Sequence, residues 1–174
     1  MERITLIPIG AIEPEILTQL KQSLEQTFAA MVEIGPQMDK PDYAYSPRRG
    51  QYLSPLILTA IGEFAAEGKM LGVADVDLYA PGLNFIFGQA DLKLGIAIIS
   101  LCRLRQEHYG LAPDKELFSQ RATKEAIHEI GHTYSLTHCR DEACVMHFSN
   151  SLADTDRKEA SLCQKCHSKL WSRP

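Results

Sequence analysis

Hydrophobic and polar positions follow strand-like and then helix-like spacing at the start of the chain. Residues Arg3 to Ile9 are apolar and β-branched enough to form a strand. Apolar side chains then recur at helical spacing from Pro14, which suits the first turn of a helix, and a short strand is expected at Met31 to Ile34. The apolar positions of this helix are Ile16, Leu17, Leu20, Leu24 and Phe28. A strand, a helix and a strand in this order predict an α/β fold whose sheet is at least partly parallel.

The next part of the chain predicts an irregular connection followed by a second helix. Residues Pro41 to Tyr52 include prolines, a glycine and three tyrosines, a composition typical of an irregular surface segment. The pattern from Ser54 to Phe64 is that of an amphipathic helix. We expect Ser54 to be its N-cap, before Pro55, and Gly68 to lie just beyond its C-terminus.

Three strands are expected in the middle of the chain, separated by turns. They are Met70 to Tyr79, Asn84 to Phe87 and Leu94 to Leu101, and the turn signals between them are Pro81-Gly82 and Gly88 to Asp91. Asp75 and Asp77 alternate with apolar residues in the first strand. Such alternation can make a functional carboxylate pair, but it is more typical of a half-buried strand, so we expect one wet face.

Composition and charge restrict the class of protein. With 174 residues and 45% hydrophobic residues, the chain is long enough for one core, which predicts a single domain over residues 1–174. The formal net charge is −4, and no stripe of lysine and arginine follows the chain, which argues against a nucleic-acid partner. The N-terminus does not resemble a secretory signal, and no apolar run reaches membrane-helix length. We therefore expect a soluble cytoplasmic protein without a membrane partner.

A further helix, expected from Ser119 to Tyr134, carries the candidate chemistry. It contains His128-Glu129-Ile130-Gly131-His132, in which the two histidines are four residues apart and thus share one helix face. Two imidazoles at this spacing can bind one zinc ion, and the glutamate between them is the residue that accepts a proton from an attacking water in metallopeptidases. His138, six residues after His132, has the spacing of a third ligand. Ser135 stands at the turn between them, where glycine is usual because the backbone there is left-handed.

Five cysteines in a chain without a secretory signal indicate metal binding rather than disulfides. Four of them form two pairs that outline a closed four-thiolate zinc site, with two disulfides as the alternative. These four are Cys139, Cys144, Cys163 and Cys166. His147 and His167 could each replace a cysteine in the set, but we expect both to be surface histidines. The fifth thiol, Cys102, follows an apolar strand and is expected to be a small buried filler.

These motifs together resemble the archaemetzincins, also called archaelysin metallopeptidases. The resemblance rests on the three histidines, on Cys139 directly after the third, on Cys144-Val-Met146, and on Cys163-x-x-Cys166. It extends to Gly72-Val-Ala-Asp-Val-Asp-Leu78 and Gly82-Leu-Asn-Phe-Ile-Phe-Gly88. It implies a compact metzincin-like α/β domain with a twisted mixed sheet, an active-site helix, a cleft and two zinc ions, one catalytic and one structural. Met146 matches the methionine that packs beneath the catalytic metal in this family.

The resemblance implies a zinc-dependent peptidase that acts on peptides or small proteins, with an aminopeptidase as one form of that activity. His128, His132 and His138 would bind the catalytic zinc, Glu129 would be the general base, and the four cysteines would bind the structural zinc, which ties together residues 139–166. The family also pairs an edge strand with extended substrate, and Asn84 to Phe87 is the candidate by position. The alternative is a zinc-stabilised module that binds a peptide or protein without cleaving it, helped by Tyr43, Tyr45 and Tyr52.

Overall fold

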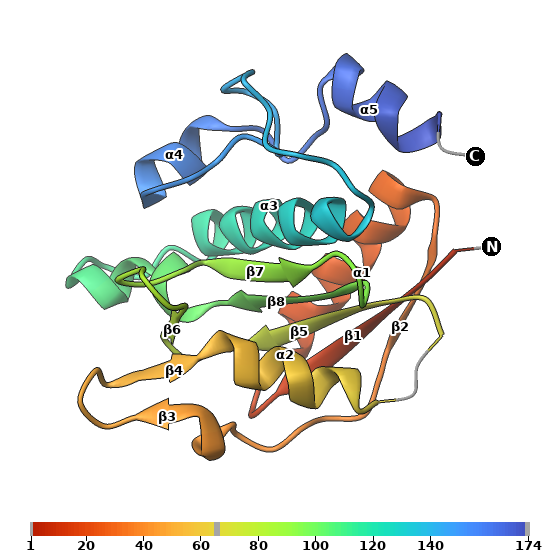
Figure 1. The fold of residues 1–174 in the computed structure, drawn as a ribbon. Coiled ribbons are helices and arrows are strands. Elements are labelled where there is room, and N and C mark those ends of the chain that lie inside the picture. The colour runs from red at the N-terminus through yellow and green to blue at the C-terminus, as the bar shows by residue number, and fades with distance from the viewer. Residues whose placement is uncertain (1, 65–66, 173–174) are drawn as a thin grey trace.

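The computed structural model describes residues 2–64 and 67–172, and its larger sheet has the strand order β2-β1-β5-β8-β7 (Figure 1). These strands are β1 (Arg3–Ile9), β2 (Met31–Ile34), β5 (Lys69–Ala74), β7 (Gly88–Asp91) and β8 (Ile96–Ser100). Neighbouring strands are parallel except for β7 and β8, which are antiparallel. The protein is thus a mixed α/β fold with a mixed sheet, as the sequence predicts.

A smaller sheet lies beside the larger one, at the bottom of Figure 1. It is formed by β3 (Tyr45–Ser46), β4 (Gln51–Leu53) and β6 (Leu78–Tyr79), and a short 3-10 turn, η1 (Asp42–Ala44), precedes it. The expectation of an irregular segment from Pro41 to Tyr52 is therefore wrong in part. The two tyrosines that pair across β3 and β4 make a local hairpin that is too short to give a periodic pattern.

Helices cover both faces of the larger sheet. Helices α1 (Pro14–Phe28) and α3 (Lys115–Thr133) pack on one face, and α2 (Ser54–Gly62) packs on the other (Figure 1). Two short 3-10 turns, η2 (Cys102–Leu104) and η3 (Gln106–Tyr109), precede α3. After α3 the chain continues through α4 (Leu152–Arg157) and α5 (Gln164–Trp171), which lie beyond α3 on the side away from the sheet (Figure 1). No helix among the described residues is long and apolar enough to span a bilayer.

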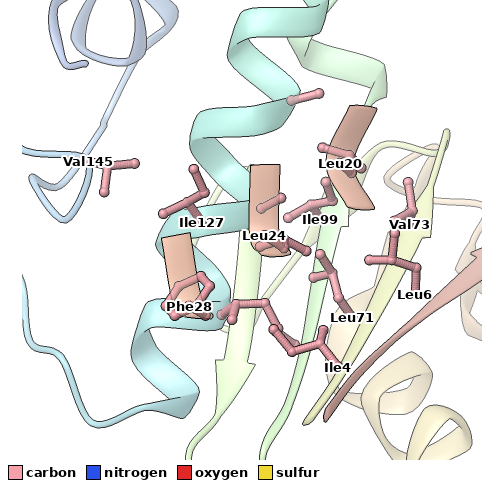
Figure 2. Packing of buried hydrophobic residues seen from close by; sticks show 14 of the residues in the cluster. Ile4, Leu6, Leu20, Leu24, Phe28, Leu71, Val73, Ile99, Ile127 and Val145 are labelled. Atoms are coloured by element: carbon pink, nitrogen blue, oxygen red, sulfur yellow. The ribbon is translucent and has the colours of Figure 1, made fainter. Parts of the chain in front are cut away.

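The main core lies between the sheet and the α1–α3 layer. In Figure 2 the side chains of Leu20 and Leu24 from α1 lie between the sheet and α3, close to Ile99 of β8. Val145, from the segment after α3, belongs to the same cluster and reaches the other side of this helix. Because sheet and C-terminal segments enclose α3 from both sides, every residue from Arg121 to Gly131 is buried. This enclosure gives the histidine-bearing helix a rigid setting.

The structure corrects the expected strand from Met70 to Tyr79. Strand β5 ends at Ala74, and its residues from Met70 onward are all buried because helices cover both faces and strands flank both edges. The expected wet face is therefore wrong. Asp75 and Asp77 lie beyond the strand in ion pairs, with Arg105 at 2.9 Å and Arg103 at 2.6 Å respectively.

The strand expected at Asn84 to Phe87 is also misplaced. Only Ile86 makes an isolated bridge there, and the neighbouring residues 88–91, expected as a turn, form β7. The turn lies instead between Asp91 and Gly95, where the Asp91 carboxylate accepts hydrogen bonds from the backbone amides of Lys93 and Leu94. Of the residues expected in the turn, Asp91 borders the actual turn, whereas Gly88 is the first residue of β7.

The structure shifts the end of α2 and the start of α3 relative to the expected bounds. Helix α2 ends at Gly62, well before Gly68, and Leu53 is its N-cap. Ser54 does not cap the helix; its hydroxyl donates to the carbonyl of Tyr79 at 3.2 Å and so ties the helix to the smaller sheet. Helix α3 starts one turn before Ser119 because the Asp114 side chain caps it by accepting from the Leu117 amide.

Candidate metal centres and cleft

The last two turns of α3 bring two imidazoles together. His128 and His132 lie one turn apart, and their Nε2 atoms are 3.0 Å from each other. His138 follows the end of the helix, and one ring nitrogen from each of the three histidines lies within 4.8 Å of the others. The three predicted ligands are therefore gathered at one point, as their spacing predicts.

Backbone carbonyls orient the two helical histidines. Nδ1 of His128 lies 2.8 Å from the carbonyl oxygen of Val145, and Nδ1 of His132 lies 2.8 Å from that of Leu136. An Nδ1–H that donates to a carbonyl leaves the Nε2 lone pair free for a metal. Burial is the main cause that lowers the pKa of His128, His132 and His138, so the neutral form that ligates zinc is favoured. Three neutral imidazoles around one point fit a zinc ion with a position left for substrate.

The chain leaves α3 through a left-handed residue at Ser135. Its φ is 62°, and its amide donates to the His132 carbonyl at 2.7 Å, while the Leu136 amide donates to Gly131. The serine therefore adopts the conformation that glycine usually supplies at this position. These two hydrogen bonds close the turn that directs the chain back toward His138.

Ser135→Gly is expected to raise the free energy of unfolding by about 0.5 kcal/mol. Glycine removes the cost of the left-handed conformation, which is roughly 1–2 kcal/mol for a residue with a side chain. It also gives the unfolded chain more conformational freedom, which lowers stability by about 0.5–1 kcal/mol. Ser135→Val, with a β-branched side chain, is expected to lower stability by about 1 kcal/mol or more. Urea unfolding of both variants measures this, and equal destabilisation by glycine and valine would contradict the assignment.

Glu129 lies between the two helical histidines and faces Gly88 of β7. The carboxyl group is buried, and burial, followed by the charge of Glu125, raises its pKa well above the usual range, while Lys158 acts in the opposite direction. A side chain on residue 88 would place its Cβ 2.6 Å from Glu129 Cγ and 2.8 Å from the backbone oxygen of Ile98. Gly88 thus makes room for the Glu129 side chain. The sequence pattern indicates only a turn at this glycine.

For the peptide cleavage that the family resemblance implies, Gly88→Ala is expected to lower kcat/KM at least about tenfold, because a displacement of the reacting groups by about 1 Å is enough for such losses. The clash cannot be relieved by a flexible side chain alone, since one of the crowded atoms belongs to the β8 backbone. Gly62→Ala in α2 is the matched control, because its Cβ would meet only the end of the Ile96 side chain, at 3.1 Å. Equal activities of the two variants would show that Gly88 does not position Glu129.

Four cysteines form a second cluster after α3. The Sγ atoms of Cys139, Cys144, Cys163 and Cys166 all lie within 4.8 Å of one another. Each carries a free thiol, so the alternative of two disulfides does not describe this structure. Four thiols gathered at one point fit a closed tetrahedral zinc site.

Backbone contacts connect the two clusters. Cys139 directly follows His138, and its amide donates to the Met146 carbonyl at 2.9 Å. Met146 is fully buried against the helix, where a Cβ on Gly131 would lie 2.5 Å from its Sδ. The methionine thus packs against the helical turn that carries the histidines, and Gly131 is the helix position that lets it approach.

The three remaining candidates lie outside both clusters. Nδ1 of His147 is 2.9 Å from the Cys139 carbonyl oxygen, and exposed His167 contacts the indole N–H of Trp171 at 3.1 Å. His167 is thus a surface histidine, as expected, whereas His147 is only partly exposed. Cys102 is also only partly buried rather than a core filler; burial and then Asp77 raise its thiol pKa to about 11.

A cavity of about 460 Å³ opens over the histidines and Glu129. One wall is the segment from Leu83 to Ala90, which includes the start of the edge strand β7. The opposite wall is formed by α3 and by Phe148, whose ring lies 5.0 Å from that of His138. The cleft that the family resemblance implies is therefore present.

Sequence reasoning missed two charged residues, one that lines this cleft and one that lies behind it. Glu125 lines it one turn before Glu129, and the ammonium of Lys158 lies 3.2 Å from its Oε1. The Lys158 side chain is completely buried. The helical spacing of Glu125 could have indicated that it shares a face with Glu129, but nothing in the local sequence around Lys158 reveals its burial.

Comparisons with known proteins agree with this fold and place the chain in a family. The model of peptidase family M54 matches residues 60–172. The archaemetzincin of Methanocaldococcus jannaschii is 49% identical over 98% of this chain and 94% of its own length. The crystal structure of archaemetzincin from Methanopyrus kandleri superposes with a TM-score of 0.85 at 37% identity, over 97% of this chain and 93% of that one. A zinc-dependent peptidase from Methanocorpusculum labreanum gives a TM-score of 0.87 at 29% identity, covering 96% of this chain and 99% of that one.

A mixed sheet that supports a His-Glu-x-x-His helix, with such relatives over nearly its whole length, defines a zinc metallopeptidase, and therefore a hydrolase. The chain belongs to peptidase family M54, the family of the archaemetzincins.

Proposed function

We propose that this chain hydrolyses peptide bonds in the cleft over His128, His132 and His138, with Glu129 as the general base. The observation that carries the proposal is the placement of Glu129. Its carboxyl group is buried, and in the sequence it lies between His128 and His132, whose Nε2 atoms are 3.0 Å apart. It also lines the cleft together with these histidines. A protein that used zinc only for stability would not need a carboxylate there.

The three histidines would hold a zinc ion, which when bound polarises a carbonyl and makes water acidic near neutral pH. A cation at this point also favours the ionised form of Glu129, against the effect of its burial. The carboxylate can then accept the proton of the attacking water and donate it to the leaving amine. Carbonyl contacts at Nδ1 of His128 and His132 keep both rings in the orientation that this requires.

The four cysteines would hold a second, structural zinc ion. Their position after His138 means that they tie residues 139–166 to the end of the active-site helix. We propose that residues 1–174 act as a single metallopeptidase domain whose C-terminal part depends on this site.

An extended peptide would bind along β7 rather than along residues 84–87. Strand β7 is at the edge of the larger sheet, pairs with β8 on one side, and contributes Gly88, Gln89 and Ala90 to the cleft. Its other side can accept a substrate strand through backbone hydrogen bonds. One form of this activity is that of an aminopeptidase, which removes residues from a free N-terminus. Cleavage of free but not of N-acetylated peptides would indicate an aminopeptidase, and cleavage of both would indicate an endopeptidase.

Metal content and cleavage test the proposal together. Mass spectrometry of the purified wild type is expected to give about two zinc ions per chain and His128→Ala about one, and a mixed peptide library should be cleaved by the wild type alone. Retained zinc without any cleavage would favour a peptide-binding module. A zinc content that His128→Ala does not change would refute the histidine site.

A further inference from the structure

The charged side chains that line the cleft are all acidic. Among the described residues that form its walls, the charged ones are Glu125 and Glu129, and no lysine or arginine is present. Glu129 has a role in the proposed hydrolysis, whereas Glu125 has none. A carboxylate whose side chain is only 4% exposed and still faces a substrate cleft requires an explanation, because buried charges are costly without a partner.

Glu125 has such a partner, and the partner lies behind it. Oε1 of Glu125 is 3.2 Å from the ammonium of Lys158 and accepts from the Thr155 hydroxyl at 3.3 Å. Lys158 does not line the cleft; its ammonium also donates to the His147 carbonyl at 3.3 Å. The ion pair is therefore oriented with its negative end toward the cleft. Both contacts use Oε1, which leaves Oε2 for a group that enters from the cleft.

Glu125 lies close to the reacting groups. It precedes Glu129 by four residues on α3, so the two carboxylates share a face and are about one helical turn, roughly 5.4 Å, apart along the axis. A peptide bond placed at Glu129 would bring a side chain or terminal group of the adjoining residue to Glu125. The pocket at Glu125 is thus a neighbour of the scissile bond.

We propose that Glu125 is a specificity-determining residue that binds a cation of the substrate, an ammonium or a guanidinium, beside the scissile bond. This rests on the proposed peptidase function. In a cleft without basic residues, a bound cation pairs with Oε2 of Glu125, whereas an apolar group desolvates Oε2 without supplying a partner for it, and an acidic group is repelled. The cation can come from a lysine or arginine side chain or from the amino terminus of the peptide.

Matched peptides test this proposal. Once the mixed library has identified a cleaved bond, each flanking position is varied as lysine, norleucine or glutamate, in peptides with a free or an acetylated N-terminus. The wild type is expected to cleave the lysine peptide with a kcat/KM about 10- to 100-fold above that of its norleucine twin, the range for hydrogen bonds to charged groups. If the cation is the terminal ammonium, acetylation of the N-terminus should lower kcat/KM by this factor, and the change from lysine to norleucine should not.

Three variants separate recognition from folding. Glu125→Gln removes the charge that faces the cleft, and Glu125→Gln combined with Lys158→Met avoids an unpaired buried ammonium. Asp156→Asn is the matched control, because Asp156 pairs with Arg121 in the same region but does not line the cleft. The ratio of kcat/KM for the lysine peptide to kcat/KM for its norleucine twin should fall to about threefold or less in the two Glu125 variants and stay unchanged in Asp156→Asn. Circular dichroism and thermal melting check that each variant is folded.

A wild-type ratio near one, or a ratio that persists in both Glu125 variants, overturns the proposal. Binding provides a readout that does not need catalysis. Fluorescence anisotropy of the labelled lysine and norleucine peptides with zinc-loaded protein should give dissociation constants that differ by the same factor and converge in Glu125→Gln. If no peptide is cleaved but the two dissociation constants still differ, the peptidase function is refuted and the cation site is supported. If the lysine and norleucine peptides bind equally well to the wild type, the cation site is refuted.

Discussion

Glu129→Gln is expected to lower kcat for peptide cleavage by about 100- to 10,000-fold while zinc content and fold are unchanged. The amide has the size of the carboxylate but cannot accept the proton of the attacking water, and positioned general bases contribute about 10²- to 10⁴-fold. The pocket made by Gly88 accommodates either side chain, so no rearrangement of α3 is expected. Steady-state kinetics on a cleaved library peptide, with zinc analysis of the same sample, measures the effect.

Glu116→Gln supplies the matched control for this experiment. Glu116 undergoes the same chemical change on the same helix, but it is exposed in the first turn, far along the sequence from the histidines. Its activity should equal that of the wild type. If Glu129→Gln kept more than a tenth of the wild-type kcat, another group would have to act as the base.

Cys166→Ala is expected to remove one zinc ion per chain and to lower the free energy of unfolding by at least about 5 kcal/mol. Structural zinc contributes of the order of 10 kcal/mol in small zinc domains, and three remaining thiolates bind the ion much less well. Cys166 is buried in the core cluster that also contains Met146 and Val145, so the loss reaches the underside of α3. Denaturant unfolding at a fixed free zinc concentration measures the change.

This variant should also weaken the histidine site, since Cys139 directly follows His138 and its amide is bonded to Met146. Cys102→Ala is the control, because this thiol lies outside both clusters; two zinc ions and a stability within about 1 kcal/mol of the wild type are expected. A Cys166 variant that retains both ions would show that the four thiols do not form one site.

Elements whose pattern depends on neighbours in the chain could be predicted well. The bounds of β1, α1 and β2 agree with the apolar periodicity, because a strand, a helix of four turns and the prolines near them are specified by local spacing. The histidine cluster is predicted for the same reason: residues four apart on a helix must share a face. The left-handed backbone at Ser135 follows from the position that the motif assigns to the turn.

Elements that depend on distant partners could not be predicted in this way. Strand β7 contains Gly88 and Asp91, which are turn residues in isolation, and it is a strand only because β8 offers an antiparallel edge. Ser54 has the sequence of an N-cap, but its hydroxyl is used by Tyr79 on another element. The burial of Lys158 similarly requires Glu125 and the His147 carbonyl, which belong to distant parts of the chain.

The sequence by itself determined the chemical groups of the candidate sites and, for the three histidines and the glutamate, spacings that short-range geometry brings together. The pairs Cys139/Cys144 and Cys163/Cys166 are separated by helix α4, so only the tertiary structure brings them to one point. The tertiary structure alone decided how that chemistry is supported. Packing of two layers around α3 buried Glu129 beside Gly88, placed the edge strand β7 along the cleft and set Glu125 in front of Lys158. The physical reason is that the spacing of the histidine ligands is a property of one helix and its following turn, whereas burial, edge position, charge pairing and the cysteine cluster arise only when segments far apart in the chain meet.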